Sequence, residues 1–208
     1  MQEQQPLPEA PESYIITPES QDRFTLLFAE SQACDLPLDD TDRIVISDMG
    51  DALEDLDGQA VGLAAVQVGY PKRIFVIRRD GRNEVFVNPV IIAQGHERST
   101  KKEGCLSLPN MAFRIARPKS ITLSWFDDSG GSHERTFVNF WARVICHEMD
   151  HLNGTILADH QDSVLVKDVP RAHFKHQEGS IIRDAAFQKR LAKRRAQNKR
   201  ARKQRAKK

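Results

Sequence analysis

Residues 146–154 read CHEMDHLNG and carry the pattern HExxH, formed by His147, Glu148 and His151. On an α-helix, residues four positions apart lie one above the other on a single face, so both imidazoles can reach one metal ion. Glu148 follows the first histidine directly, which places it about 100° around the helix and close to the ion. The stretch therefore predicts a helix that holds a metal ion and keeps a carboxylate base beside it.

Two earlier positions of this predicted helix share the stripe of the histidines. Phe140 and Val144 precede His147 at helical spacing, so the ligand face continues as an apolar wall. The spacing of Phe140 and Val144 fits two interpretations equally: an apolar pocket beside the metal ion, or packing in the hydrophobic core. Asn139 is an acceptable cap for the start of the helix, and the Asn-Gly pair at 153–154 is a good stop.

The rest of the chain predicts one more helix and a set of short strands. Apolar residues at helical spacing follow Thr41, a residue that can cap a helix, and they end before Asp57. Strand-like runs separated by turn signals occupy residues 73–79, 84–92, 105–108, 113–115, 120–126 and 132–138. Several short strands followed by a metal helix favour an α+β fold, with antiparallel sheets packed around the central HExxH helix.

The charge of the chain is divided between an acidic body and a basic tail. Residues 189–208 hold 12 Lys or Arg and no acid, whereas residues 1–188 hold 19 basic and 29 acidic side chains. We therefore divide the chain into a flexible leader (residues 1–18), a catalytic domain (19–183) and a basic C-terminal helix or tail (184–208). A tail of this kind suits a phosphate backbone, although a solvated, disordered tail would have the same composition.

The composition also bears on compartment. No run of about 18 apolar residues is found, so we expect no membrane span, and the acidic, Pro-rich start does not resemble a targeting signal. The chain has three cysteines, an odd number, at wide and irregular spacing, so we do not expect a disulfide framework. These features predict a cytoplasmic protein, and the absence of an obvious assembly helix predicts a monomer.

The HExxH pattern supplies two metal ligands, and the third has to be found elsewhere. A metzincin would have a histidine at position 157, where this chain has Leu157. A thermolysin-like protease would use a downstream glutamate, and Glu178 in a polar stretch is the only one after Glu148. Upstream, Cys105 follows a glycine and precedes an apolar run, and a thiolate with two imidazoles leaves one position open for water. An isolated cysteine is more often a small buried hydrophobe, so both interpretations stay open.

Three motifs together resemble those of the peptide deformylase family: GLAAVQ at 62–67, EGCLS at 103–107 and HEMDH at 147–151. The resemblance runs from about residue 42 to 160. It implies a hydrolase that removes the N-formyl group from the initiator methionine of nascent polypeptides. It also implies one divalent metal ion held by Cys105, His147 and His151, most often Fe(II), with Zn, Ni or Co as alternatives.

The resemblance implies further roles. Glu148 would act as general base and then general acid toward water activated by the metal ion. The Gln67 amide and the Leu106 backbone N–H would stabilise the oxyanion, and Gly62 would let the peptide backbone approach closely. Phe140 and Val144 would accept the methionine side chain.

The chain departs from the family pattern at a few positions. Cys146 stands where the family commonly has glutamine, and it faces away from the histidine stripe, which favours packing over metal binding. Residues 1–40 match no usual family opening. None of these departures removes a predicted catalytic group.

The basic tail has an expected partner, and the HExxH pattern leaves two alternative functions open. By the same resemblance, residues 185–208 are expected to contact the ribosome or its RNA. The alternatives are an HExxH zinc metalloprotease and a ribosome- or RNA-binding protein whose metal site is not catalytic. An open site with two histidines and one cysteine argues against the latter, because structural zinc sites are usually closed by four protein ligands.

Overall fold

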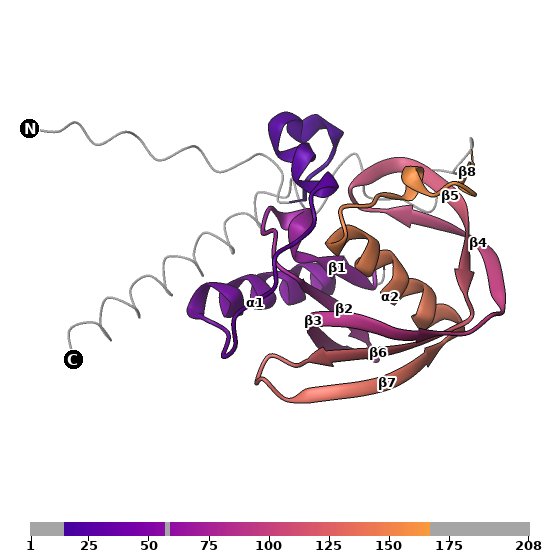
Figure 1. Ribbon diagram of the computed structural model, residues 1–208. Helices are drawn as coiled ribbons and strands as arrows, with labels where there is room; N and C mark the ends of the chain where they lie inside the picture. The colour runs from indigo at the N-terminus through magenta and orange to yellow at the C-terminus, as the bar shows by residue number, and fades with distance from the viewer. Residues whose placement is uncertain (1–14, 57–58, 167–208) are drawn as a thin grey trace, which may run out of the picture.

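The computed structural model describes residues 15–56 and 59–166 (Figure 1). The strands are β1 (Gly62–Ala64), β2 (Ile74–Arg79), β3 (Arg82–Gln94), β4 (Arg98–Cys105), β5 (Leu108–Pro118), β6 (Ser120–Phe126), β7 (Ser132–Val138) and β8 (Val164–Leu165). The α-helices are α1 (Asp40–Asp55) and α2 (Asn139–Leu152), and the 3-10 helices are η1 (Pro18–Phe28), η2 (Ala65–Val68) and η3 (Leu157–Asp159).

The strands form two antiparallel sheets. The larger sheet has the order β1-β2-β3-β6-β7 and the smaller one the order β4-β5-β8. Tight connections such as the Asp80-Gly81 turn, where both residues have positive φ, join neighbouring strands. The register between β4 and β5 shifts between Gly104 and Cys105, which is a place where an irregular strand can redirect a side chain.

In β2 and the adjoining part of β3, successive side chains of the larger sheet are buried on opposite faces. Phe75, Ile77 and Phe86 point into a core that α2 shares, whereas Val76 and Val87 point into a second core. The second core is completed by apolar residues of α1, namely Ile46, Met49, Ala52 and Leu53. Each α-helix therefore covers one face of the same sheet.

The helix α2 lies between the two sheets (Figure 1). Its residues Ile145 and Met149 share a core with Phe86 of the larger sheet and with Phe113 and Ile115 of the smaller one. The predicted α+β class, with antiparallel sheets packed around a central HExxH helix, is confirmed. The helix begins at Asn139 without a side-chain cap, and it ends before Gly154, which has a φ of 68°.

The structure corrects two predicted boundaries. The α1 helix is capped by Asp39, not Thr41: the Asp39 Oδ1 atom accepts hydrogen bonds from the backbone N–H groups of Thr41 (2.6 Å) and Asp42 (2.8 Å). Ile15 and Ile16, which the sequence placed in the leader, are buried, so the packed part of the chain includes residues before 19. The remaining leader (1–14) and the basic tail (184–208) lie outside the described residues.

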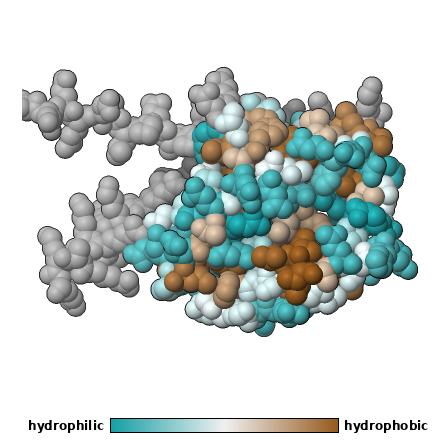
Figure 2. All heavy atoms as spheres, in the orientation of Figure 1, coloured by the Kyte–Doolittle hydropathy of each residue, from teal (hydrophilic) through white to brown (hydrophobic). Residues whose placement is uncertain are grey.

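The surface is mixed in character. Figure 2 shows apolar side chains in separate patches among hydrophilic ones, and Val90 and Ile92 of β3 are about half exposed. Scattered apolar residues of this kind are normal on the surface of a folded protein. Within residues 15–56 and 59–166, no helix is long and apolar enough to cross a membrane.

Candidate active site

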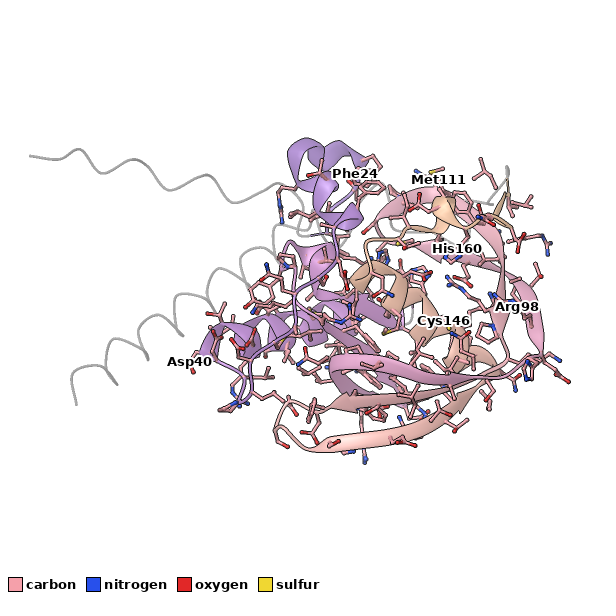
Figure 3. All side chains as sticks on the ribbon, in the orientation of Figure 1. Phe24, Asp40, Arg98, Met111, Cys146 and His160 are labelled. Carbon is pink, nitrogen blue, oxygen red and sulfur yellow. The ribbon has the colours of Figure 1, made fainter. Side chains whose placement is uncertain are left out.

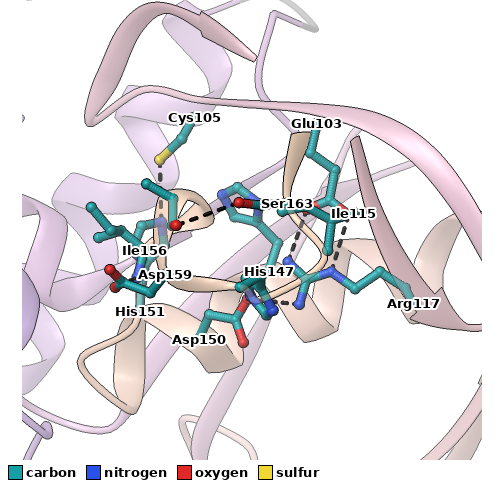
Figure 4. A network of polar contacts seen from close by, with 12 residues as sticks. Glu103, Cys105, Ile115, Arg117, His147, Asp150, His151, Ile156, Asp159 and Ser163 are labelled. Atoms are coloured by element: carbon teal, nitrogen blue, oxygen red, sulfur yellow. Dashed lines mark hydrogen bonds and ion pairs between the residues drawn. The ribbon is translucent and has the colours of Figure 1, made fainter. Parts of the chain in front are cut away.

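The hairpin of β4 and β5 brings Cys105 to the helix α2. Cys105 ends β4, and its Sγ atom lies 3.3 Å from Nε2 of His151. One ligand atom from each of Cys105, His147 and His151 lies within 4.8 Å of the other two, a group that could hold a metal ion. The structure therefore brings together the three residues that the sequence analysis proposed as ligands (Figure 4).

The His147 ring is oriented by a carboxylate. Its Nδ1 atom lies 3.2 Å from Oε2 of Glu103, which is 7% exposed. An Nδ1–H group that donates to this carboxylate leaves the lone pair of Nε2 free to bind a metal ion. Because His151 also directs Nε2 at Cys105, both rings offer the same nitrogen to the space between them.

The electrostatics of the group favour a thiolate. Burial by itself would raise the pKa of the Cys105 thiol, but the imidazoles of His151 and His147 lower that pKa well below its ordinary value. A thiolate, and not a thiol, is the form that binds metal ions. The donor set of one thiolate and two imidazoles therefore suits a divalent transition metal.

Glu148 lies beside this group in a buried position. It is 4% exposed, and within the described part of the chain its Oε2 atom has no hydrogen-bond partner. Burial raises the pKa of Glu148 to about 7, although His147 and His151 oppose the shift. A carboxylate with a pKa near 7 and a free oxygen is suited to taking up and releasing a proton at neutral pH.

Gly62 makes room for Glu148. A Cβ atom at position 62 would lie 2.3 Å from Oε1 of Glu148 and 2.9 Å from its Cδ atom, so any side chain there would force the carboxylate to move. The sequence analysis expected Gly62 to admit the peptide backbone. The structure gives a second reason for the glycine, since the carboxylate of Glu148 occupies the space of its missing side chain.

Gln67 is held at the edge of the same group. Its Oε1 atom accepts a hydrogen bond from the backbone N–H of Ala64 (2.9 Å), which fixes the orientation of the amide. Its Nε2 atom therefore faces Oγ of Ser107 (3.2 Å) and Sγ of Cys105 (3.6 Å). Leu106 follows Cys105 directly in the link to β5, so its backbone N–H belongs to the same corner of the site.

The remaining predicted residues lie on α2. Val144 is 8% exposed and belongs to the core that α2 shares with both sheets, whereas Phe140 is 56% exposed and packs edge-on against Trp141. Cys146 is buried in that core and is not part of the metal-binding group (Figure 3). This placement agrees with the packing role expected for Cys146.

A polar network that the sequence did not indicate lies behind the ligands. Glu103 pairs with Arg117 through two hydrogen bonds (3.1 and 2.9 Å) and also pairs with Arg143. Arg117 reaches Asp150 of α2 (2.7 Å), and Asp150 also contacts His160 (2.7 Å), as Figure 4 shows in part. Glu103 lies inside the EGCLS motif and Asp150 inside the HEMDH motif, but neither motif indicates that the two residues share a network. The other members come from β5 (Arg117), from α2 (Arg143) and from the segment after η3 (His160).

Fold and site define the class of protein. An HExxH helix between antiparallel sheets, a cysteine at the end of a hairpin and a buried glutamate are the parts of a metal-dependent hydrolase. Comparisons with known proteins identify the family within this class.

The profile of the family described as polypeptide deformylase matches residues 20–166. A peptide deformylase of Borreliella burgdorferi is 44% identical over 115 residues, which cover 54% of this chain and 69% of that protein. Another, of Bartonella quintana, is 37% identical over 158 residues, covering 70% and 89%. The crystal structure of the peptide deformylase from Thermotoga maritima matches with a TM-score of 0.63 and 30% identity, over 71% of this chain and 96% of that one. The chain belongs to the polypeptide deformylase family.

Membership of the polypeptide deformylase family shows what reaction the protein catalyses. The protein is a hydrolase that removes the N-formyl group from nascent polypeptides, and dependence on a metal ion is general in the family. The metalloprotease and RNA-binding alternatives are therefore set aside as the main function.

Proposed function

We propose that Cys105, His147 and His151 hold one divalent metal ion and that Glu148 is the general base and acid of deformylation. The observation that carries this proposal is the convergence of three ligand atoms within 4.8 Å beside a buried carboxylate that has an unpartnered oxygen. Such a group is costly to bury unless an ion or a reacting molecule completes it.

The donor set is chemically suited to the ion. A thiolate with two imidazoles suits several divalent transition metals, and Fe(II) is the one we propose, with Zn, Ni or Co able to substitute. Three protein ligands leave a position open, unlike the four that close most structural zinc sites. When bound, such an ion supplies Lewis acidity, which makes water a better nucleophile at neutral pH.

The side chains of this chain would then divide the proton and charge chemistry. Glu148, with its raised pKa, takes a proton from the attacking water and later gives one to the departing amine. The Gln67 amide and the Leu106 backbone N–H donate to the oxygen of the formyl group as it gains negative charge. Gly62 keeps space for the Glu148 carboxylate throughout.

The substrate is a peptide that begins with formyl-methionine. Val144 and the more exposed Phe140 share the helical stripe of the ligands on α2, and we propose that they contact the methionine side chain. A thioether side chain is flexible and polarisable, which suits an apolar wall that also carries an aromatic ring. The protein acts as a monomer in the cytoplasm. All three of its cysteines are free, in keeping with a reducing compartment.

The activity is tested with the tripeptide formyl-Met-Ala-Ser. We expect release of formate and a free amino terminus, and no cleavage of the internal peptide bonds, because the site is built for the terminal formyl group. Acetyl-Met-Ala-Ser serves as the control substrate and should react far more slowly. Cleavage of internal bonds at a comparable rate would instead support the metalloprotease alternative.

The basic tail is proposed to keep the enzyme near its substrate at the ribosome. Its 12 cationic side chains in residues 189–208 are attracted to phosphate backbones, and such binding weakens steeply with added salt. Deletion of residues 185–208 should leave hydrolysis of formyl-Met-Ala-Ser unchanged and weaken ribosome binding in a co-sedimentation assay at low salt. Equal ribosome binding with and without the tail, insensitive to salt, would contradict the proposal.

A further inference from the structure

The carboxylate of Glu103 has more partners than a buried ion pair requires. Arg117 already meets both oxygens, since Nε donates to Oε1 (3.1 Å) and Nη2 donates to Oε2 (2.9 Å). The second oxygen also accepts from Nδ1 of His147 (3.2 Å), and the first also accepts from Nη1 of Arg143. A second guanidinium in this place calls for an explanation, because removing a charge from water is costly.

Arg143 belongs to the helix that carries the histidines. It precedes His147 by one helical turn, so the two side chains lie on the same face of α2. Its side chain is 11% exposed. Besides Glu103, Arg143 donates to the backbone carbonyls of Ile115 (3.0 Å) and Ser99. Every one of these acceptors lies in β4 or β5, and Cys105 is the last residue of β4.

The ligand set is divided between the same two elements. His147 and His151 come from α2, and Cys105 comes from the end of β4. Arg143 reaches from α2 to the hairpin, and Arg117 reaches from the hairpin back to Asp150 of α2 (2.7 Å). Both arginines meet at Glu103. The two arginines therefore link the two elements on which the ligands lie.

We propose that Arg143 is a positioning residue for the metal ligand His147. By holding Oε1 of Glu103 from the side of α2, Arg143 keeps Oε2 on the Nδ1–H of His147, and Nε2 of His147 then faces the ligand group. The inference rests on the proposed role of His147 as a ligand. In this role Arg143 contacts neither the substrate nor the ion, and it acts through the carboxylate of Glu103.

The test measures the metal affinity of the full-length protein by competition with a chelator, using Zn(II). Arg143→Met removes the charge and the hydrogen bonds, and Arg143→Gln removes the charge but keeps an amide that can donate to a strand carbonyl. Loss of an outer-shell partner typically weakens metal binding about 10- to 100-fold, and we expect about 10-fold for both variants. Arg143→Lys, which restores a cation, should recover most of the affinity. The surface pair of Arg135 with Glu84 supplies the matched control, and Arg135→Met should bind as the wild type does.

A second measurement separates positioning from general destabilisation. In the Glu103→Gln background, Arg143→Met should weaken metal binding no further, because the carboxylate through which it acts is gone. Nitrogen NMR of the His147 ring should show one tautomer in the wild type and a mixture in Arg143→Met. The NMR and affinity readouts are taken well below each unfolding midpoint, so that only folded protein is compared. Wild-type affinity in both neutral variants, or an undiminished loss in the Glu103→Gln background, would overturn the proposal.

The proposed function has its own control in the same assay. His147→Ala should lose far more affinity than any Arg143 variant if His147 is a ligand. Unchanged affinity in His147→Ala would refute the proposed metal site itself. A strong loss in His147→Ala together with wild-type binding in the neutral Arg143 variants would refute only the role of Arg143.

Discussion

Glu148→Gln is expected to abolish deformylation while the metal ion stays bound. Glutamine has nearly the same shape, so it fits the space beside Gly62 that the carboxylate occupies. It cannot accept a proton, however, and the loss of a positioned general base typically lowers kcat by about 10²–10⁴-fold. Glu148 is outside the group of three ligand atoms, so the metal content should not fall.

The measurement is the initial rate on formyl-Met-Ala-Ser, with the metal content of the same sample determined by atomic absorption. Glu54→Gln is the matched control. Glu54 is an exposed glutamate that pairs with Arg78, and both residues lie far from the HExxH pattern in the sequence. This variant should retain full activity. Substantial turnover by Glu148→Gln would show that Glu148 is not the base, and loss of its metal would show that Glu148 also helps to hold the ion.

Cys105→Ser is expected to remove most of the bound metal, and the activity with it. A hydroxyl group stays protonated where the thiol ionises, so the variant loses the anionic ligand that His151 and His147 stabilise. We expect an affinity loss of at least ~100-fold, above the range typical of an outer-shell partner. The variant should also prefer metals that accept oxygen ligands more readily.

Metal retention after dialysis against a chelator measures this effect, and the Co(II)-loaded protein adds a thiolate-to-metal absorption band that should vanish. Cys146→Ser is the control, since it also places a hydroxyl group in the buried core but lies outside the ligand group. It should lose some stability and keep both metal and absorption band. A Cys105→Ser protein that still holds Fe(II) at wild-type affinity would disprove ligation by Cys105.

The fold class was accessible from local patterns. The short apolar run at residues 74–77 indicates a buried strand, and the spacing of His147 and His151 follows from the period of the helix, which is a property of the backbone. The cap of α1 was misplaced at Thr41 because Asp39 and Thr41 can both cap a helix. Only the hydrogen bonds of the Asp39 carboxylate distinguish them.

The site was accessible because its members lie in short motifs. Cys105, His147 and His151 belong to two stretches whose residue types already suit a metal ion, and the structure brings their ligand atoms together. The role of Gly62 beside Glu148 was not accessible. This role depends on how β1 packs against α2, and the residue pattern within either segment does not indicate that packing.

The amino-acid sequence alone was enough to predict an HExxH helix and an α+β class, and the family resemblance proposed Cys105 as the third ligand. It did not reveal that Glu103 is held by Arg117 and Arg143. Metal-binding motifs are local, because neighbouring residues of one helix or one turn supply most of the ligands. Buried ion pairs join segments that meet only when the sheets pack around α2. In that interior of low polarity, an unpaired charge is costly, so each buried charge needs its partner.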